Sequence, residues 1–152
     1  MSDMSDIKKV ELETMGLDDV QVKYEFEIMP TNVGNKFYHE HVMGFLTHLV
    51  RNYGVFSPVL AGMAIPNVFE WKDIQKISRE ILRNASIMKA GSTYVCDDQG
   101  NCELFIKSRN ERYIAIYFAM LINFPGDLSF FGLRPPVGGD TDDKSDPETA
   151  EK

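Results

Sequence analysis

Polar and apolar residues alternate strictly between Gln21 and Ile28. The apolar members fall on every second position, at Val22, Tyr24, Phe26 and Ile28. An extended chain would place them all on one face, so this segment is predicted to be a half-buried β-strand that ends before Pro30. The preceding segment Val10–Met15 either begins a short strand or stays a loop.

Apolar spacings of three and four residues then predict three helices. The first covers about Val33–Tyr53 and ends at a glycine. A short second helix lies within residues 56–66, where Ser57 precedes a proline at the first helical position and Pro66 ends the helix. The third covers about Phe69–Asn84, with Phe69 and isoleucines on its buried stripe. Its outward-facing residues are Lys72, Lys76, Arg79, Glu80 and Arg83.

The period changes again after the third helix. Two β-prone arms, Thr93–Cys96 and Cys102–Ile106, flank the turn-forming segment Asp97–Asn101, which predicts a hairpin. The two cysteines of the chain would lie across this hairpin as thiols in a reducing cytosol, and a disulfide is geometrically possible if they face each other. A structural zinc site needs four ligands, and no second Cys or His pair follows at a suitable spacing.

Tyr113–Gly126 is a run of fourteen residues without a charge. Ser108 and Glu111 resemble a capping box that would open a helix here, and Pro125 with the following glycine would close it. Apolar residues occupy every side of such a helix, so it must be buried in a core, a membrane or a partner. At about 1.5 Å per residue it reaches only about 20 Å, too short to cross a membrane.

Length and charge favour one folded domain with acidic ends. The chain has 152 residues, 43% of them hydrophobic, and a net charge of −7. Residues 1–19 and 135–152 each hold six acids against two lysines, so each end carries −4 and residues 20–134 in between carry +1. We expect a single mostly helical domain at 20–134, an acidic flexible segment at 1–19 and an acidic disordered tail at 135–152. Scattered basic residues argue against nucleic-acid binding, and the N-terminus shows no secretory signal.

The predicted fold class is mainly α with a small β-hairpin (α+β), built as a compact bundle of three to four helices with an N-terminal strand. No nucleophile elbow, phosphate-binding glycine loop or dinucleotide fingerprint is present, so no enzyme activity and no cofactor are expected. His39 and His41 point apart on a helix, and His48 lies two turns further on, so no metal site is expected either. Asp97 and Asp98 fit a turn better than a calcium loop.

Three segments resemble the tail assembly chaperones of long-tailed bacteriophages, over about residues 21–133. EIMPTNVGNKF followed by HLVRNYGV is similar to their opening strand and helix, and SREILRNASIM is similar to the helix that leads into their variable loop. ERYIAIYFAMLINFPGDLSFFG resembles their closing helix, which runs into an aromatic Phe-Pro-Gly end. The segment that holds the two cysteines departs from the pattern of this family.

The resemblance implies a non-enzymatic protein that binds the phage tape-measure protein, keeps it soluble and promotes tail-tube assembly around it. It also implies a location in the host cytoplasm and absence from the mature virion. In some members a frameshift adds a C-terminal extension that recruits the tail-tube protein, and such an extension would start in the acidic tail near Asp140–Glu151. A homo-oligomer stays open. The alternatives are a structural tail or connector component and an acidic host-directed inhibitor.

A chaperone of this kind needs exposed apolar surface. Seven residues of the uncharged helix and the aromatic cluster after it are the candidates for client binding: Ile114, Tyr117, Phe118, Leu121, Phe124, Phe130 and Phe131. The other interpretation is that these residues are core.

Overall fold

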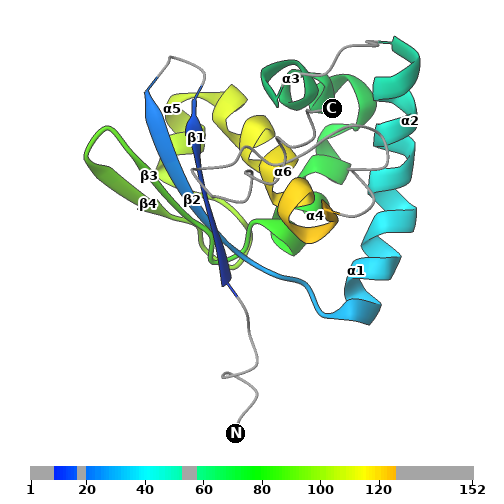
Figure 1. Cartoon of the computed structure of the whole chain (residues 1–152), viewed down its shortest axis with the longest axis horizontal. Helices are drawn as coiled ribbons and strands as arrows, with labels where there is room; N and C mark the ends of the chain where they lie inside the picture. The colour runs from blue at the N-terminus through cyan, green and yellow to red at the C-terminus, as the bar shows by residue number, and fades with distance from the viewer. Residues whose placement is uncertain (1–8, 17–19, 53–57, 126–152) are drawn as a thin grey trace, which may run out of the picture.

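A mixed α+β fold is seen in the computed structural model, which describes residues 9–16, 20–52 and 58–125 (Figure 1). The elements in chain order are β1 (Lys9–Met15), β2 (Gln21–Glu27), α1 (Thr31–Phe37), the π-helical η2 (Tyr38–Val42), α2 (Met43–Asn52), α3 (Pro58–Val68), α4 (Trp71–Ile81), β3 (Ser86–Lys89), β4 (Ser92–Val95), α5 (Glu103–Lys107) and α6 (Arg109–Asn123). Phe130, Phe131, the predicted tail 135–152 and residues 1–8 of the predicted flexible segment 1–19 lie outside the described residues. The flexible segment was wrong for residues 9–15, which form β1 and pair with β2, so the folded domain begins before residue 20.

The four strands form one antiparallel sheet in the order β1-β2-β3-β4. Leu12 pairs with Tyr24, Tyr24 with Ile87 and Ile87 with Tyr94, so one row of side chains crosses the whole inner face of the sheet. The predicted alternation at residues 21–28 is confirmed by β2, whose Val22, Tyr24 and Phe26 are buried. The sequence predicts one N-terminal strand and a separate hairpin, whereas the described residues form one sheet of four strands.

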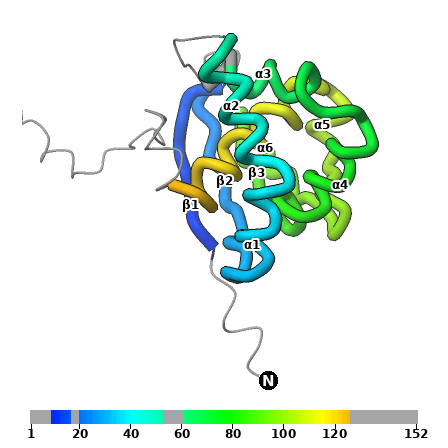
Figure 2. Tube along the Cα trace, turned by 90° about the vertical axis from the view of Figure 1, so that its right-hand side faces the viewer, coloured from blue at the N-terminus to red at the C-terminus, as the bar shows by residue number. Residues whose placement is uncertain are grey.

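Helix α6 lies at the centre of the molecule, between the sheet and the other helices (Figures 1 and 2). It packs against α3, α4, α5 and β2, and every residue from Ile114 to Leu121 is buried. Its uncharged sequence is explained by this position, because a helix covered on all sides has no face for polar residues. Gly62 of α3 lets the two helices approach closely, since a Cβ there would lie 3.0 Å from the Cα of Ile114 and overlap its side chain.

The long predicted helix is present as α1, η2 and α2 without a break in the chain, from Thr31 to Asn52. Five residues in its middle are π-helical, a wider winding that the apolar spacing does not reveal. Pro66 does not end α3, which continues to Val68 with a bond from the Phe69 N–H to the Ile65 carbonyl. This prediction was wrong because packing against α6 outweighs the lost proline bond.

The predicted hairpin was also misplaced. The structure has a hairpin of β3 and β4 joined by Ala90 and Gly91, which have φ values of 52° and 79°. Positive φ at both central residues is the geometry of a type I′ turn. The second predicted arm, Cys102–Ile106, is not a strand, since α5 occupies it and buries the adjacent side chains of Leu104 and Phe105. Two neighbouring buried residues suit a helix, because a strand would send them to opposite faces.

The start of α6 agrees with the sequence, but the expected side-chain capping bond does not form. Ser108 precedes the helix and accepts the Glu111 N–H through its backbone carbonyl. The Glu111 carboxylate instead pairs with Lys89 of β3, and both side chains are buried or nearly so. A charge on the first turn of α6 therefore connects the helix to the sheet.

Candidate partner-binding surface

An open groove of about 410 Å³ runs along the outer side of α4. Four residues of α4 share this side because they are spaced three and four apart, and two residues of the loop 97–101 face them. The lining is Lys72, Gln75, Lys76, Arg79, Gln99 and Asn101. Three of these side chains are cationic and none is acidic, in a protein whose net charge is −7. The groove is therefore a basic site on an acidic protein.

The loop wall of the groove has a defined conformation. The Asp97 carboxylate accepts the backbone N–H of Gln99 at 2.9 Å and of Asn101 at 3.0 Å. These bonds, the Asn101 one first, lower the pKa of Asp97 because they favour its charged form. The Gly100 N–H also donates to the Asp97 carbonyl at 3.0 Å, which closes the turn.

Gly100 docks the loop onto α4. Its φ of +75° is a conformation that suits glycine, and a Cβ at this position would overlap the carbonyl oxygen of Ser78. The same Cβ would lie 3.2 Å from the Cβ of Leu82. The two walls of the groove are therefore in direct backbone contact at its base, which only a glycine allows.

Arg112 of α6 donates hydrogen bonds to both walls of the groove, α4 and the loop 97–101. Its guanidinium donates to the Asn101 Oδ1 at 2.8 Å, the Ser78 Oγ at 3.0 Å and the Gly100 carbonyl at 3.5 Å. Burial lowers the pKa of Arg112, and the surrounding cysteines oppose that shift. A single planar cation thus fixes the loop relative to α4.

The Arg112 guanidinium also lies over two aromatic rings, 5.4 Å from the centroid of Trp71 and 4.9 Å from that of Phe105. Phe105 is buried, whereas Trp71 is 54% exposed at the start of α4, next to Lys72 of the groove. Ile106, the neighbour of Phe105 on α5, is 84% exposed. Tryptophan and arginine are the residue types that contribute most to protein interfaces. Figure 2 shows α4 and α5 on the side of the molecule opposite β1.

Lys76 is shared between the groove and the helix across from it. Its Nζ lies 3.7 Å from the Glu40 Oε1 of η2, and the His41 Nε2 lies 3.7 Å from the same oxygen. Lys72 and Arg79 are more exposed than Lys76, so they are the cations most accessible to an anionic partner. Exposed cations give specificity and a faster association more than they give affinity.

Cys96 and Cys102 flank the loop 97–101, and both are buried free thiols. The Asp97 N–H donates to the Asn101 carbonyl at 2.9 Å, which brings the residues at the two ends of the loop close together. The bond from Cys96 lowers the pKa of Cys102 to about 7, helped by the backbone N–H groups of Phe105 and Leu104 and by Arg112. The pKa of Cys96 is raised, because its proton is held in that bond and its side chain is buried.

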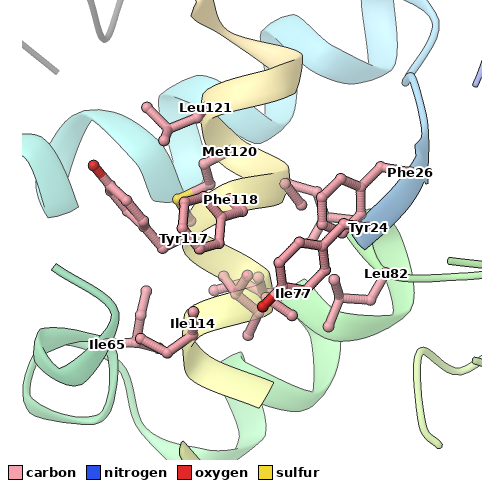
Figure 3. Close-up of a cluster of buried hydrophobic side chains, with 14 of the residues drawn as sticks. Tyr24, Phe26, Ile65, Ile77, Leu82, Ile114, Tyr117, Phe118, Met120 and Leu121 are labelled. Carbon is pink, nitrogen blue, oxygen red and sulfur yellow. The ribbon is translucent and has the colours of Figure 1, made fainter. Parts of the chain in front are cut away.

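The five described candidates for client binding lie in the core. They are Ile114, Tyr117, Phe118, Leu121 and Phe124, each at most 9% exposed. Figure 3 shows the first four on α6 packed with Tyr24, Phe26, Ile65, Ile77 and Leu82. They present no exposed surface to a partner, so the groove and Trp71 replace them as the candidate surface.

The histidines show no shared geometry. The His41 ring is buried and packs 4.9 Å from the Phe37 centroid and 6.1 Å from that of Phe69, whereas His39 is exposed. Within residues 9–16, 20–52 and 58–125, no three His, Cys, Asp or Glu side chains are placed to hold a metal ion. In the same part of the chain no helix is both long and apolar enough to cross a membrane.

Part of this surface was visible in the sequence, where the lysines and arginine of α4 form an outward-facing stripe. The loop that completes the groove was assigned to the tip of a hairpin. Its contact with α4 depends on Gly100 and Arg112, which lie 22 and 34 residues beyond Ser78. Contacts across such separations leave no periodic signal in one sequence.

Comparisons with known proteins give no information about this surface. No family model matches the chain, and neither a curated protein nor a solved structure matches it.

Proposed function

We propose that this protein is a non-enzymatic tail assembly chaperone of a bacteriophage, which binds the tape-measure protein and keeps it soluble while the tail tube assembles around it. The specific role derives from the resemblance of residues 21–133 to that family. The observation that carries the proposal is the exposed Trp71 beside a basic groove, which is a suitable surface for a client protein.

The chemistry of the groove defines the client segment. Trp71 offers a large apolar contact, and the groove cations follow it along α4. Lys72 is the next residue, and Lys76 and Arg79 come at further intervals of four and three residues. An amphipathic helix fits this arrangement when it carries one large apolar residue followed by carboxylates at intervals of three or four residues. Long coil-forming proteins are rich in such segments.

Other parts of the proposal concern residues outside the described ranges. Phe130 and Phe131 remain candidates for client contact, and residues 1–8 and the acidic segment 135–152 are proposed as flexible tails that oppose aggregation. Recruitment of the tail-tube protein through a C-terminal extension, a homo-oligomer and a location in the host cytoplasm also remain proposals. Client contact by the five buried residues of the α6 region would require the core to open.

Co-expression with a phage tape-measure protein tests the proposal. We expect the wild-type chain to raise the soluble fraction of the client, and Trp71→Ala or the double variant Lys72→Glu with Arg79→Glu to reduce it. Val95→Ala and Arg51→Glu are matched controls, since both positions are exposed on other elements. Circular dichroism checks that each variant is folded.

Two outcomes would contradict the proposal. A client that is equally soluble with and without the wild-type chain rules out the chaperone role. If the wild-type chain acts but the groove variants act equally well, the role stands and the groove is the wrong surface. Mass spectrometry of purified virions separates a chaperone, which is absent from them, from a structural tail or connector component.

A further inference from the structure

The two cysteines of the chain meet at the base of the loop that forms one wall of the groove. Cys96 directly precedes this loop and Cys102 directly follows it. Both are buried in the same hydrophobic core, Cys96 at 2% and Cys102 at 9% exposure. Two cysteines whose backbones lie close together in a folded domain can be joined with little movement of the chain.

Backbone hydrogen bonds hold both cysteines in this position. The Cys96 N–H donates to the Ala85 carbonyl at 2.8 Å, and the Cys102 carbonyl accepts the Phe105 N–H at 3.1 Å. Between them, the Asp97 N–H donates to the Asn101 carbonyl at 2.9 Å, which brings the two ends of the loop together. The proximity of the two cysteines is thus set by backbone hydrogen bonds on both sides of the loop.

We propose that Cys96 and Cys102 are an oxidisable pair that forms a reversible intramolecular disulfide, with a hydroperoxide as the oxidant. This inference is independent of the proposed chaperone role, because it concerns the chemistry of the pair and not the partner in the groove.

The reaction balances in two steps. The Cys102 thiolate attacks one oxygen of hydrogen peroxide, the O–O bond breaks, and the hydroxide that leaves takes up a proton as water, so that Cys102 becomes a sulfenic acid. The Cys96 sulfur then attacks the Cys102 sulfur, the S–O bond breaks, and water leaves with the proton of Cys96. In sum, two thiols and one hydrogen peroxide give one disulfide and two waters. A small thiol such as dithiothreitol reverses the bond by exchange.

The roles of the two cysteines differ. Cys102 is the attacking residue because it is the more exposed of the two and its thiolate is stabilised by Cys96, two backbone N–H groups and Arg112. Cys96 is the resolving residue because it is more deeply buried, keeps its proton and lies next to the sulfur that must be attacked. A small peroxide reaches a slightly exposed sulfur more readily than a bulky disulfide reagent does.

The disulfide is expected to restrict the conformation of the loop that forms one wall of the groove. A disulfide between Cys96 and Cys102 would close the loop on itself and limit its opening, since a covalent bridge restricts the conformations of the chain between its ends. Gln99 and Asn101, which line the groove, lie inside that loop. Oxidation is therefore expected to rigidify the binding surface without covering it.

Treatment of the full chain with dilute hydrogen peroxide tests the inference. We expect the intact mass to fall by two hydrogen atoms, a peptide map to show Cys96 joined to Cys102, and dithiothreitol to restore the mass. In Cys96→Ser, dimedone is expected to trap a sulfenic acid on Cys102, whereas Cys102→Ser should stay largely unmodified at Cys96.

The pH dependence of alkylation gives a second readout. With iodoacetamide, the midpoint for Cys102 is expected near 7 in the folded chain, as its pKa indicates, and near about 8.5 in the urea-unfolded chain. Cys96→Ala, which removes the donor to the Cys102 thiolate, should raise the folded midpoint. The inference is overturned if the oxidised chain keeps both thiols, or if Cys96 in Cys102→Ser oxidises as fast as Cys102 in Cys96→Ser.

Discussion

Gly100 lies against the carbonyl oxygen of Ser78, so closely that a side chain at position 100 would overlap this oxygen. The contact joins the loop 97–101 to α4 at the base of the groove. Both the positive φ of Gly100 and the close approach require a residue without a Cβ. The shape of the groove therefore depends on one backbone contact.

Gly100→Ala is expected to destabilise the protein on the order of 3 kcal/mol, because it combines the cost of a left-handed alanine with a steric clash. The free energy of unfolding in urea measures this. Gly91→Ala is the matched control, since Gly91 has a φ of +79° and nothing within 4 Å of the added Cβ. It should cost only about 1–2 kcal/mol. Equal losses in the two variants would mean that the Ser78 contact does not matter.

Breaking the buried ion pair between Lys89 and Glu111 is expected to be costly. Glu111→Gln removes the carboxylate that pairs with the nearly buried lysine, and we expect a loss of about 3–5 kcal/mol in urea unfolding. The double variant Lys89→Met with Glu111→Leu should recover most of that stability, because it removes both charges. Glu11→Gln, which breaks the exposed pair with Lys23, should cost less than about 1 kcal/mol. A similar loss for the exposed and the buried pair would contradict this prediction.

Tyr24→Phe is expected to leave stability unchanged or to raise it by about 1 kcal/mol. The Tyr24 hydroxyl is buried and has no hydrogen-bond partner among the residues that the structure describes, so its removal relieves a desolvation cost. Burial, with a smaller contribution from Glu111, also raises the pKa of Tyr24. Tyr94→Phe, whose hydroxyl accepts a bond from Lys107 at 3.3 Å, is the comparison. A clear loss of stability in Tyr24→Phe would point to a bridging water.

Acid is expected to destabilise the protein through His41. Burial lowers the pKa of His41, an effect that outweighs the opposing influence of Glu40, Glu80 and Asp73. The unfolded chain therefore binds a proton more readily than the folded one as the pH falls below about 6.5, and stability drops in that range.

Urea unfolding between pH 7 and pH 5 measures the effect. His41→Gln should flatten the dependence relative to the wild type, whereas His39→Gln, at an exposed position, should leave it as it is. The same slope in His41→Gln and in the wild type would show that other groups cause the acid sensitivity.

The sequence predicted the elements whose side-chain pattern has one period from end to end. The alternation at residues 21–28 became β2, and the helical spacing at 33–53 and 69–84 became most of α1 to α2 and α4. It failed where one residue fits two patterns. Ile87 continues the apolar spacing of the third helix and also alternates within β3, so β3 was missed. The first predicted arm, Thr93–Cys96, is mostly β4, but it pairs with β3 and not with the second predicted arm, which is helical.

The candidate surface was predicted only in part. The basic stripe of α4 follows from helical spacing, but an exposed Trp71 and a wall made by the loop 97–101 do not. The uncharged helix was open to two interpretations, core or partner surface, because its sequence is apolar on every side. The helix lies among α3, α4, α5 and the sheet, and the five described candidate residues are therefore part of the core.

By itself the sequence determined most of the local elements, the outward-facing charges of α4 and the apolar character of the helix that contains Ile114–Leu121. These features depend on the pattern of neighbouring residues along the chain. Tertiary structure alone decided what covers α6, which loop completes the groove and that Cys96 meets Cys102. Those relations depend on contacts between distant segments, such as Gly100 on Ser78 and Arg112 on Asn101. Their physical basis is close packing and hydrogen bonding between segments that are far apart in the sequence. Such contacts leave no periodic pattern in a single sequence.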